Sequence, residues 1–285
     1  MKIIALMVLR NEAWVLGASL RAALKWCDGA AILLDRCTDA TVDIVREIAK
    51  ETTKEILVSE TDEAEHWSEM FHRQKNLEDG RSLGGTHFAI VDADEILTHN
   101  NLEHVRGWFE SLQDGEVLDV PMIAPWKSLD AYSPHTRGVI TLGFKDMPGM
   151  GWAPRGEEQY HHHNRPPHGM TARRSVECEG GVFHLQWAAW ERMKMKHIHY
   201  MLSERVRWGY SPREINERYH WFDRPPHGQD LLSVPSEWWG NYSKSSIKLD
   251  HTVWYERECR RLVRCHGAAI MGGLDLFGWD GVVGE

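Results

Sequence analysis

No long apolar run occurs in this chain of 285 residues. A membrane-spanning helix needs about 20 consecutive apolar residues, so we expect no membrane span. The N-terminal apolar run, Ile3 to Leu9, has only seven residues and is followed by Arg10-Asn11-Glu12. Because this run lacks the small-residue cleavage site that ends a signal peptide, we expect a first strand there.

Cysteine is scarce and shows neither a disulfide nor a zinc-binding pattern. The chain has five cysteines, and no two of them form a C-x-x-C pair. An odd number without such spacing argues against a disulfide framework and against a thiolate zinc site. We therefore expect a reducing compartment and predict a cytoplasmic protein. The hydrophobic fraction of 42% and the charged fraction of 26% are typical of an ordinary globular chain.

Motifs of several other enzyme classes are missing. The chain has no G-x-x-x-x-G-K-[ST] loop, no G-x-G-x-x-G after the first predicted strand and no G-x-S-x-G elbow. These absences disfavour P-loop, dinucleotide-binding and hydrolase-elbow folds. Three consecutive histidines occur at 161–163. Adjacent side chains cannot all face one ion, and no compact H-x-x-x-H helix accompanies them, so we disfavour a zinc hydrolase.

Charge is divided unevenly along the chain. Residues 1–120 contain 12 Lys and Arg against 23 Asp and Glu, and residues 121–285 contain 21 against 19. The second part also holds 12 of the 17 histidines and 10 of the 14 tryptophans. Such a division suggests that the acidic part handles a metal and a nucleotide while the other part meets a different molecule. The alternative is that most of the tryptophans simply fill a core.

The first hundred residues alternate between short apolar runs and segments with helical spacing. This alternation predicts βαβ units and a mostly parallel sheet. After residue 100 the pattern loosens. We expect long ordered loops with short strands at 124–180 and a loop-rich segment at 209–250. We predict strands at 3–9, 31–34, 55–58, 87–91, 117–123 and 181–185, and helices near 16–24, 41–49, 67–77, 187–208 and 252–266.

The most informative stretch is F-A-I-V-D-A-D-E-I-L at 88–97. A short apolar run bounded by polar residues is typical of a buried strand. Asp92 and Asp94 follow that run at positions i and i+2, and two such carboxylates can jointly hold a hard divalent cation. A cation at the carboxyl edge of an α/β sheet usually accompanies a phosphorylated ligand. An exposed acidic turn is the alternative interpretation.

Three segments carry a family resemblance through their order and spacing. They are V-L-R-N-E at 8–12, L-L-D-R-C-T-D-A-T at 33–41 and V-D-A-D at 91–94. Together they resemble a family 2-type glycosyltransferase of the GT-A fold. The second segment departs from the family pattern by having Arg36-Cys37 where Gly-Ser is commoner, and Ala40 where Gly is commoner.

The resemblance implies an α/β fold of the GT-A, Rossmann-like type, with a mostly parallel sheet flanked by helices. It places the glycosyltransferase domain at 1–205, with a nucleotide-sugar-binding half at 1–100 and an acceptor half at 101–205. Residues 206–285 would then form a helical C-terminal extension packed on that domain. The implied reaction moves a sugar from a nucleotide-diphosphate donor to an acceptor hydroxyl.

In the family, the ends of the first two strands hold the nucleotide. Those roles would be taken here by Arg10, Asn11, Glu12 and Asp35, and Arg73 resembles the family's basic residue near the nucleotide. A carboxylate such as Asp35 can accept the imide N–H of uracil, which favours a UDP donor. Thymidine would present the same group. For Arg73, a solvated helix face is the alternative.

The resemblance also implies Mn²⁺ or Mg²⁺ as cofactor. Asp92 and Asp94 match the family's Asp-x-Asp motif, and V-F-H-L-Q-W at 182–187 places His184 as a late metal ligand. A neutral imidazole that completes an oxygen-rich coordination sphere is reasonable chemistry. The ion would act as a Lewis acid on the diphosphate and would orient the donor.

An inverting transfer, which we favour, needs a general base beside the acceptor hydroxyl. In this fold the base is commonly an acid near the start of a helix after the acceptor-side strands. Our candidates are Glu158 and Glu157 in P-R-G-E-E-Q-Y, with Asp130 as a third. A retaining transfer would need no such base.

The acceptor cannot be read from the residues. A saccharide or a lipid-linked acceptor is expected for the family, and Trp126, Trp152, Trp187, Trp190 and Trp221 are candidates for stacking on a sugar. A modified DNA base, a hydroxymethylated pyrimidine, is a further possible acceptor. Two copies of Arg-Pro-Pro-His-Gly, at 165–169 and 224–228, permit that interpretation, whereas the net charge of −9 argues against it. Two different functions, a non-catalytic binding protein and a nucleotidyltransferase, also stay open.

Overall fold

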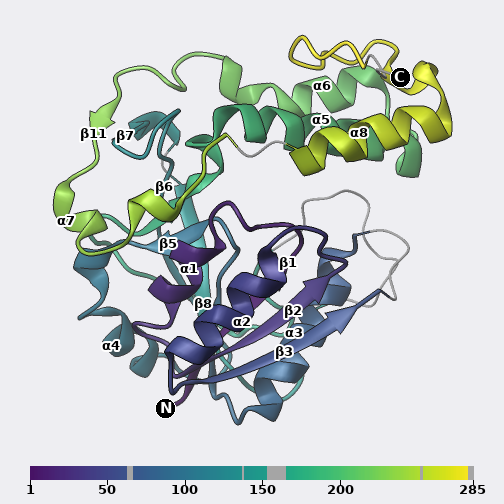
Figure 1. Cartoon of the computed structure of the whole chain (residues 1–285). Coiled ribbons are helices and arrows are strands. Elements are labelled where there is room, and N and C mark those ends of the chain that lie inside the picture. The colour runs from purple at the N-terminus through teal and green to yellow at the C-terminus, as the bar shows by residue number, and fades with distance from the viewer. Residues whose placement is uncertain (63–66, 137, 153–164, 251–252, 282–285) are drawn as a thin grey trace.

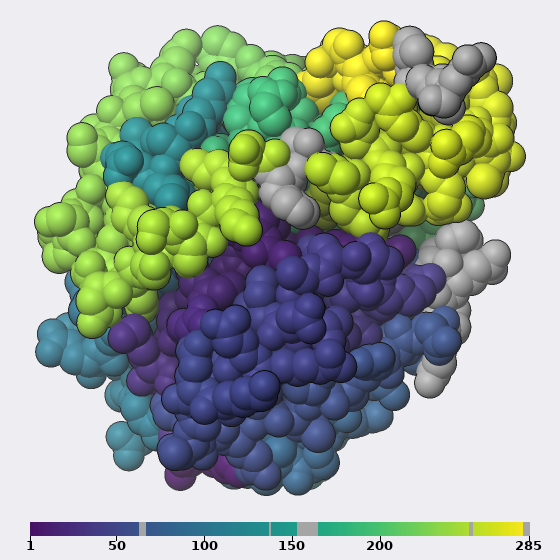
Figure 2. Space-filling view, in the orientation of Figure 1, coloured from purple at the N-terminus to yellow at the C-terminus, as the bar shows by residue number. Residues whose placement is uncertain are grey.

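The computed structural model describes residues 1–62, 67–136, 138–152, 165–250 and 253–281. Figure 1 shows a central sheet with helices packed against it, and a layer of later helices lies above the sheet. In the space-filling view, the green to yellow segments cover one end of the purple and blue N-terminal part (Figure 2). The functional question is therefore what lies between the sheet edge and this helical layer.

The main sheet contains nine strands among the described residues. They are β1 Ile3–Leu9, β2 Gly29–Asp35, β3 Glu55–Thr61, β4 His87–Ile90, β5 Glu95–Leu97, β6 Glu116–Ile123, β8 Gly138–Lys145, β9 Ala172–Ser175 and β10 Val182–His184. β3, β2, β1 and β4 lie side by side with parallel pairing. β8 pairs antiparallel with both β4 and β6, and β10 pairs parallel with β6. β8 therefore runs opposite to β4 and β6, and β10 runs in the same direction as β4.

Helices bury both faces of this sheet, which explains its apolar strands. The helices are α1 Leu16–Ala23, α2 Thr41–Glu51, α3 Glu69–Ser82, α4 Val105–Glu110, α5 Trp190–Trp208, α6 Pro212–Tyr219, α7 Ser236–Trp239 and α8 Val253–His266. Alternate residues of β1 point to opposite faces. Met7 joins the core formed with α1 and α2, whereas Leu6 packs in a second core with Leu77 of α3. Packing on both faces of the sheet therefore holds the ends of its strands in place.

The later helices have a core of their own. Ile198 and Leu202 of α5 cluster with Ile215 of α6 and Leu262 of α8. α5 ends at Gly209, whose φ of 66° is a left-handed conformation that glycine adopts without strain. α6 begins with a capping box, in which the Ser211 and Glu214 side chains bond each other's backbone N–H. These three helices form the layer above the sheet in Figure 1.

The expected α/β fold, a mostly parallel Rossmann-like sheet flanked by helices, is confirmed. Short strands were expected among the loops of 124–180, and β8 is a longer strand of eight residues, whereas α6 was not expected, because 209–250 looks loop-rich. On α2, Val45 and Ile48 are buried, whereas Ala49 is exposed. α5 starts at Trp190 and not at 187, because 185–187 form a 3₁₀ turn. It continues through residue 205, and the domain division at that point stays a prediction.

Two further observations concern compartment and membrane. Within the described ranges, no helix is both long and apolar enough to cross a membrane. All five cysteines are free thiols. Burial raises the pKa of the Cys27 and Cys259 thiols, so these two side chains pack as small apolar groups.

Candidate functional site

Three strands bring the candidate site residues to one edge of the sheet. β1 ends just before Arg10 and Glu12, β4 ends just before Asp92 and Asp94, and β10 ends at His184. These strands run in one direction, so their carboxyl ends lie at the same edge. The edge is the place where open α/β sheets bind ligands.

A cavity of about 220 Å³ lies at this edge. Its floor comes from the strand ends and α3, and its other wall comes from α5 and α8. The lining combines charged side chains with several aromatic rings. The positively charged side chains suit an anionic group, and the aromatic rings suit a flat ring of a ligand. The lining residues are Val8, Arg10, Glu12, Trp67, Glu69, Arg73, Asp92, Ala93, Asp94, His184, Gln186, Lys196, His199, Tyr200, Trp254 and Tyr255.

Asp94 is the most unusual residue of the cavity. Only 5% of it is exposed, and its Oδ2 atom has no hydrogen-bond partner among the described residues. This oxygen lies 3.8 Å from His184 Nε2 and 3.8 Å from Lys196 Nζ. Burial opposes ionisation, but Lys196 and His184 together hold the pKa of Asp94 below its ordinary value. Asp94 is therefore an ionised carboxylate whose Oδ2 atom has charged neighbours but accepts no hydrogen bond from the described residues.

Asp92 is placed differently, because two arginines hold it. Arg73 donates to its Oδ1 at 3.0 Å, and Arg165 donates to its Oδ2 at 2.9 Å. Burial opposes ionisation, yet Arg73 and Arg165 hold the pKa of Asp92 well below its usual range. Arg165 also donates to both oxygens of Glu95, at 2.7 and 2.5 Å. The negative charge of Asp92 is thus compensated by the guanidinium groups of Arg73 and Arg165, which are held in place.

The predicted metal site is not assembled in this arrangement. Across the described residues, no three His, Cys, Asp or Glu side chains form a group that could hold a metal ion. Asp94 Oδ2 and His184 Nε2 face each other, but both oxygens of Asp92 are engaged by arginines. Mg²⁺ and Mn²⁺ prefer several oxygen ligands. The side chains as placed do not fit the three-residue site, and the ion stays a prediction.

Glu12 links the sheet edge to the helical layer. Its Oε2 atom accepts from Trp14 Nε1 at 2.6 Å and from Arg192 of α5 at 2.7 Å. Arg192 is 1% exposed, and its guanidinium lies over the rings of Trp14 and Tyr255. Burial is the main reason that the pKa of Glu12 is raised, and Arg192 opposes that rise. Glu12 lines the cavity while it anchors α5.

Asn11 and Asp35 lie behind the cavity wall. Asn11 has a φ of 57°, and its Oδ1 accepts from the backbone N–H groups of Thr38 and Asp39 at 2.7 and 3.1 Å. Asp35 is fully buried and accepts from Arg36 at 2.7 Å and from Arg10 at 3.4 Å. Neither residue lines the cavity. Their direct nucleotide contacts stay predictions, and the observed contacts shape the loop and hold Arg10.

Of the three candidate bases, only Asp130 lies among the described residues, and it is not part of this cavity. Asp130 pairs with Lys244, its side chain is 79% exposed, and it does not line the cavity. Glu157 and Glu158 lie outside the described residues. Trp126, Trp152 and Trp187 are buried in the core, so the expectation that these three stack on a sugar is wrong. The tryptophans that do line the cavity are Trp67 and Trp254.

Sequence reasoning missed the residues that α5 contributes. Arg192, Lys196 and Tyr200 recur at i, i+4 and i+8, which places them on one face of a helix. Lys196 and Tyr200 line the cavity, and Arg192 donates to Glu12, which also lines it. The spacing is visible in the sequence, but nothing local indicates that this face meets the acidic turn. Arg165 stands out in the sequence only as part of a repeated loop.

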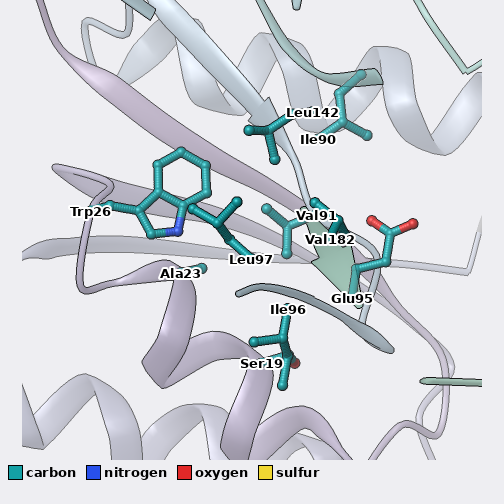
Figure 3. Close-up of a pocket in the computed structure, with 10 residues that line it drawn as sticks. All are labelled: Ser19, Ala23, Trp26, Ile90, Val91, Glu95, Ile96, Leu97, Leu142 and Val182. Carbon is teal, nitrogen blue, oxygen red and sulfur yellow. The ribbon is translucent and has the colours of Figure 1, made fainter. Parts of the chain in front are cut away.

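A much smaller void of about 10 Å³ lies behind the acidic turn. It is lined mainly by apolar side chains such as Trp26, Val91 and Leu142, with the Glu95 carboxylate at its rim (Figure 3). Such a volume has room for about one water molecule. We therefore assign it to packing and place the candidate site in the larger cavity.

Comparison with known proteins gives a limited likeness. No family model and no curated protein sequence matches the chain. The structure of S. aureus TarS is similar over 96% of this chain and 50% of that chain, with 11% identity and a TM-score of 0.46. S. aureus TarS 1–349 in complex with UDP is similar over 50% of this chain and 38% of that chain, with 16% identity and a TM-score of 0.35. The chain thus spans half or less of the length of these structures, and likeness at this level assigns no function.

Proposed function

We propose that this chain is a glycosyltransferase that moves a sugar from a nucleotide-diphosphate donor, uridine-linked, to an acceptor hydroxyl. The donor would lie at the carboxyl edge of the sheet, where a hydroxyl group of its sugar or ribose, or a bridging cation, would meet the Asp94 carboxylate. The proposal is carried by one observation: the Asp94 carboxylate lines the cavity, and one of its oxygens is buried without a hydrogen-bond partner among the described residues. Because buried polar groups are normally paired, this oxygen offers a bonding position to a ligand in the cavity.

The lining of the cavity supports this class of ligand. Arg10, Arg73 and Lys196 contribute positive charge, which suits phosphate groups. Trp67 and Trp254 contribute flat apolar faces, which suit a sugar ring or a nucleobase. A nucleotide sugar combines both kinds of group in one molecule.

The proposed reaction is a substitution at the anomeric carbon of the sugar. The acceptor hydroxyl oxygen forms a bond to that carbon, and the bond between the carbon and the phosphate oxygen breaks. The nucleoside diphosphate leaves with the bonding electron pair, and a base takes the hydroxyl proton. Positive side chains placed in advance along the cavity would stabilise the charge that develops on the leaving diphosphate.

Glu158 and Glu157 remain our candidates for the base of an inverting transfer. Of the two described residues that flank their segment, Arg165 contacts a residue that lines the cavity. Trp152 donates its backbone N–H to Gln74 of α3 at 2.9 Å, and Arg165 contacts Asp92. Asp130 is the weaker candidate, because it does not line the cavity.

A thermal-shift screen of nucleotide sugars, each with Mn²⁺ and with EDTA, tests the proposal. At 100 times the dissociation constant, a bound donor should raise the melting temperature by about 5 °C. Asp94→Ala should lose this shift. We also expect the wild-type protein to hydrolyse its bound donor slowly, and Asp94→Ala should lose that activity. Asp130→Ala is the matched control, because it removes an exposed carboxylate outside the cavity, and it should keep the shift.

The result also separates the rival functions. A shift without hydrolysis or transfer would favour a non-catalytic binding protein. Release of pyrophosphate from a nucleoside triphosphate would favour a nucleotidyltransferase. Binding to duplex DNA with a steep salt dependence would favour a DNA acceptor. If no nucleotide sugar stabilises the protein under either condition, the proposed function is wrong.

A further inference from the structure

Positive side chains already balance the carboxylates that line the cavity. Glu69 and Asp92 are bonded by Arg73 at 2.6 and 3.0 Å. Arg165 adds a second bond to Asp92, and Arg192 bonds Glu12 at 2.7 Å. Because a buried charge must be compensated, these pairs satisfy the acids of the cavity without any added cation.

Among the acids that line the cavity, Asp94 has the weakest contact with a positive side chain. Its Oδ2 atom faces Lys196 Nζ at 3.8 Å, which is longer than a hydrogen bond. The closest polar contact that the structure gives the Lys196 ammonium is Gln186 Oε1, at 3.3 Å. An ammonium group has three donors, so Lys196 has donors left for another acceptor.

Lys196 is fixed in place by the helix that carries it. Arg192, one turn earlier on α5, is locked between Glu12 and two aromatic rings. Lys196 itself is largely enclosed, with 16% of its side chain exposed, and its ammonium lies 5.9 Å from the centre of the Tyr200 ring. The ammonium is thus held at the cavity wall beside the carboxylate that a metal ion would need.

A divalent cation on Asp94 Oδ2 would lie next to this ammonium, and the two charges would repel. We propose that Lys196 binds the donor's diphosphate directly and takes the place of the divalent cation in holding it. This inference rests on the proposed function and makes it more specific. It predicts a nucleotide-diphosphate site whose affinity depends on a side chain of α5 and not on Mn²⁺.

Calorimetric titration of UDP into the full chain, with EDTA and with Mn²⁺, tests this directly. The wild-type protein should bind UDP in EDTA with an affinity within about threefold of that in Mn²⁺. Lys196→Met should weaken binding in EDTA by about tenfold or more, because a charge-assisted hydrogen bond is lost. Lys196→Arg keeps the charge and should retain most of the affinity.

Lys194→Met is the matched control. Lys194 lies on the same helix, pairs with Glu191 at 2.6 Å and does not line the cavity. This variant should bind UDP within about twofold of wild type. Circular dichroism of both methionine variants shows whether α5 is intact, and the arginine variant keeps the comparison informative if Lys196→Met folds poorly.

The outcomes distinguish this inference from the proposed function. Binding of UDP by wild type only when Mn²⁺ is present would overturn the role of Lys196 and leave the proposed function standing. Equal affinity of wild type and Lys196→Met in EDTA would do the same. Failure of wild type to bind UDP in both buffers would overturn both.

Discussion

Arg165 and Arg224 show how far the surroundings decide the role of a single residue. Each begins a copy of the sequence Arg-Pro-Pro-His-Gly. Arg165 donates to Asp92, to Glu95 and to two backbone carbonyl oxygens, so its five N–H groups make five hydrogen bonds. Arg224 is exposed. Identical pentapeptides therefore hold a buried anchor in one copy and a solvated side chain in the other.

Arg165→Lys should destabilise the protein by about 3 kcal/mol or more. A lysine ammonium cannot reproduce the planar fork, and the buried Glu95 carboxylate would be left with incomplete compensation. Urea unfolding gives the free energy of unfolding of each variant. Arg224→Lys serves as the matched control and should change that free energy by less than about 0.5 kcal/mol. Equal effects of the two substitutions would show that Arg165 is not the anchor described above.

The acids of the site were easier to predict than their partners. Asp92 and Asp94 stand out because they follow an apolar run. The arginines that hold Asp92 are 19 and 73 positions away in the chain, and no local pattern pairs residues at such distances. Consequently the sequence indicated the two carboxylates of the candidate site but not the arginines that hold Asp92.

At the scale of elements, α8 contributes the aromatic wall of the cavity. Trp254, in its first turn, lines the cavity and lies over the Arg10 guanidinium at 5.2 Å. It also lies beside the ring of His199, at 5.7 Å between centroids. A segment more than 240 positions from Arg10 therefore completes the site that begins at the end of β1.

Trp254→Ala should weaken binding of UDP and of the preferred nucleotide sugar by about tenfold, the usual effect of losing one stacked ring. Trp254→Phe keeps an aromatic face and should lose much less. Calorimetric titration measures both. Trp221→Ala is the control, because Trp221 is 38% exposed and lies outside the cavity lining. Unchanged affinity of Trp254→Ala would mean that no ring of the donor lies against α8.

Elements were predictable where local patterns and burial agree. The bounds of β1 follow from its apolar run, and those of β3 and α2 were found within a few residues. α6 was missed because only Ile215 and Tyr219 of its eight residues are buried. Its S-P-R-E start, however, is the signature of a capping box and could have revealed it. The position and length of β8 were missed, although short strands were expected there, because its neighbours along the chain are rich in glycine and proline.

At the scale of the whole molecule, the buried polar groups make stability depend on pH. His72 on α3 is completely buried between the rings of Trp67 and Phe71. Neither ring nitrogen has a hydrogen-bond partner among the described residues. Burial is the main cause that lowers the pKa of His72 to about 4. The folded protein therefore keeps this ring neutral at pH values where the unfolded chain protonates it.

The sign of the effect follows from proton linkage. Between the unfolded pKa of about 6.5 and the folded pKa, the unfolded state binds more protons, so stability falls as the pH falls. The loss has a limit of about 1.4 kcal/mol for each pH unit. Above pH 7 both states are neutral at this ring, and His72 no longer contributes to the pH dependence.

We expect His72→Phe to flatten this dependence. From pH 7 to pH 5 the wild-type free energy of unfolding should fall by about 2 kcal/mol more than that of the variant. Urea unfolding at pH 7, 6 and 5 measures the difference. The contribution of the buried acids to the pH dependence cancels in this difference, because both proteins contain them. His104→Phe, which replaces a histidine with a 57% exposed side chain, should run parallel to wild type. Parallel curves for wild type and His72→Phe would show that the ring accepts a proton in the folded state, so α3 would have to be more open beside the cavity than it is here.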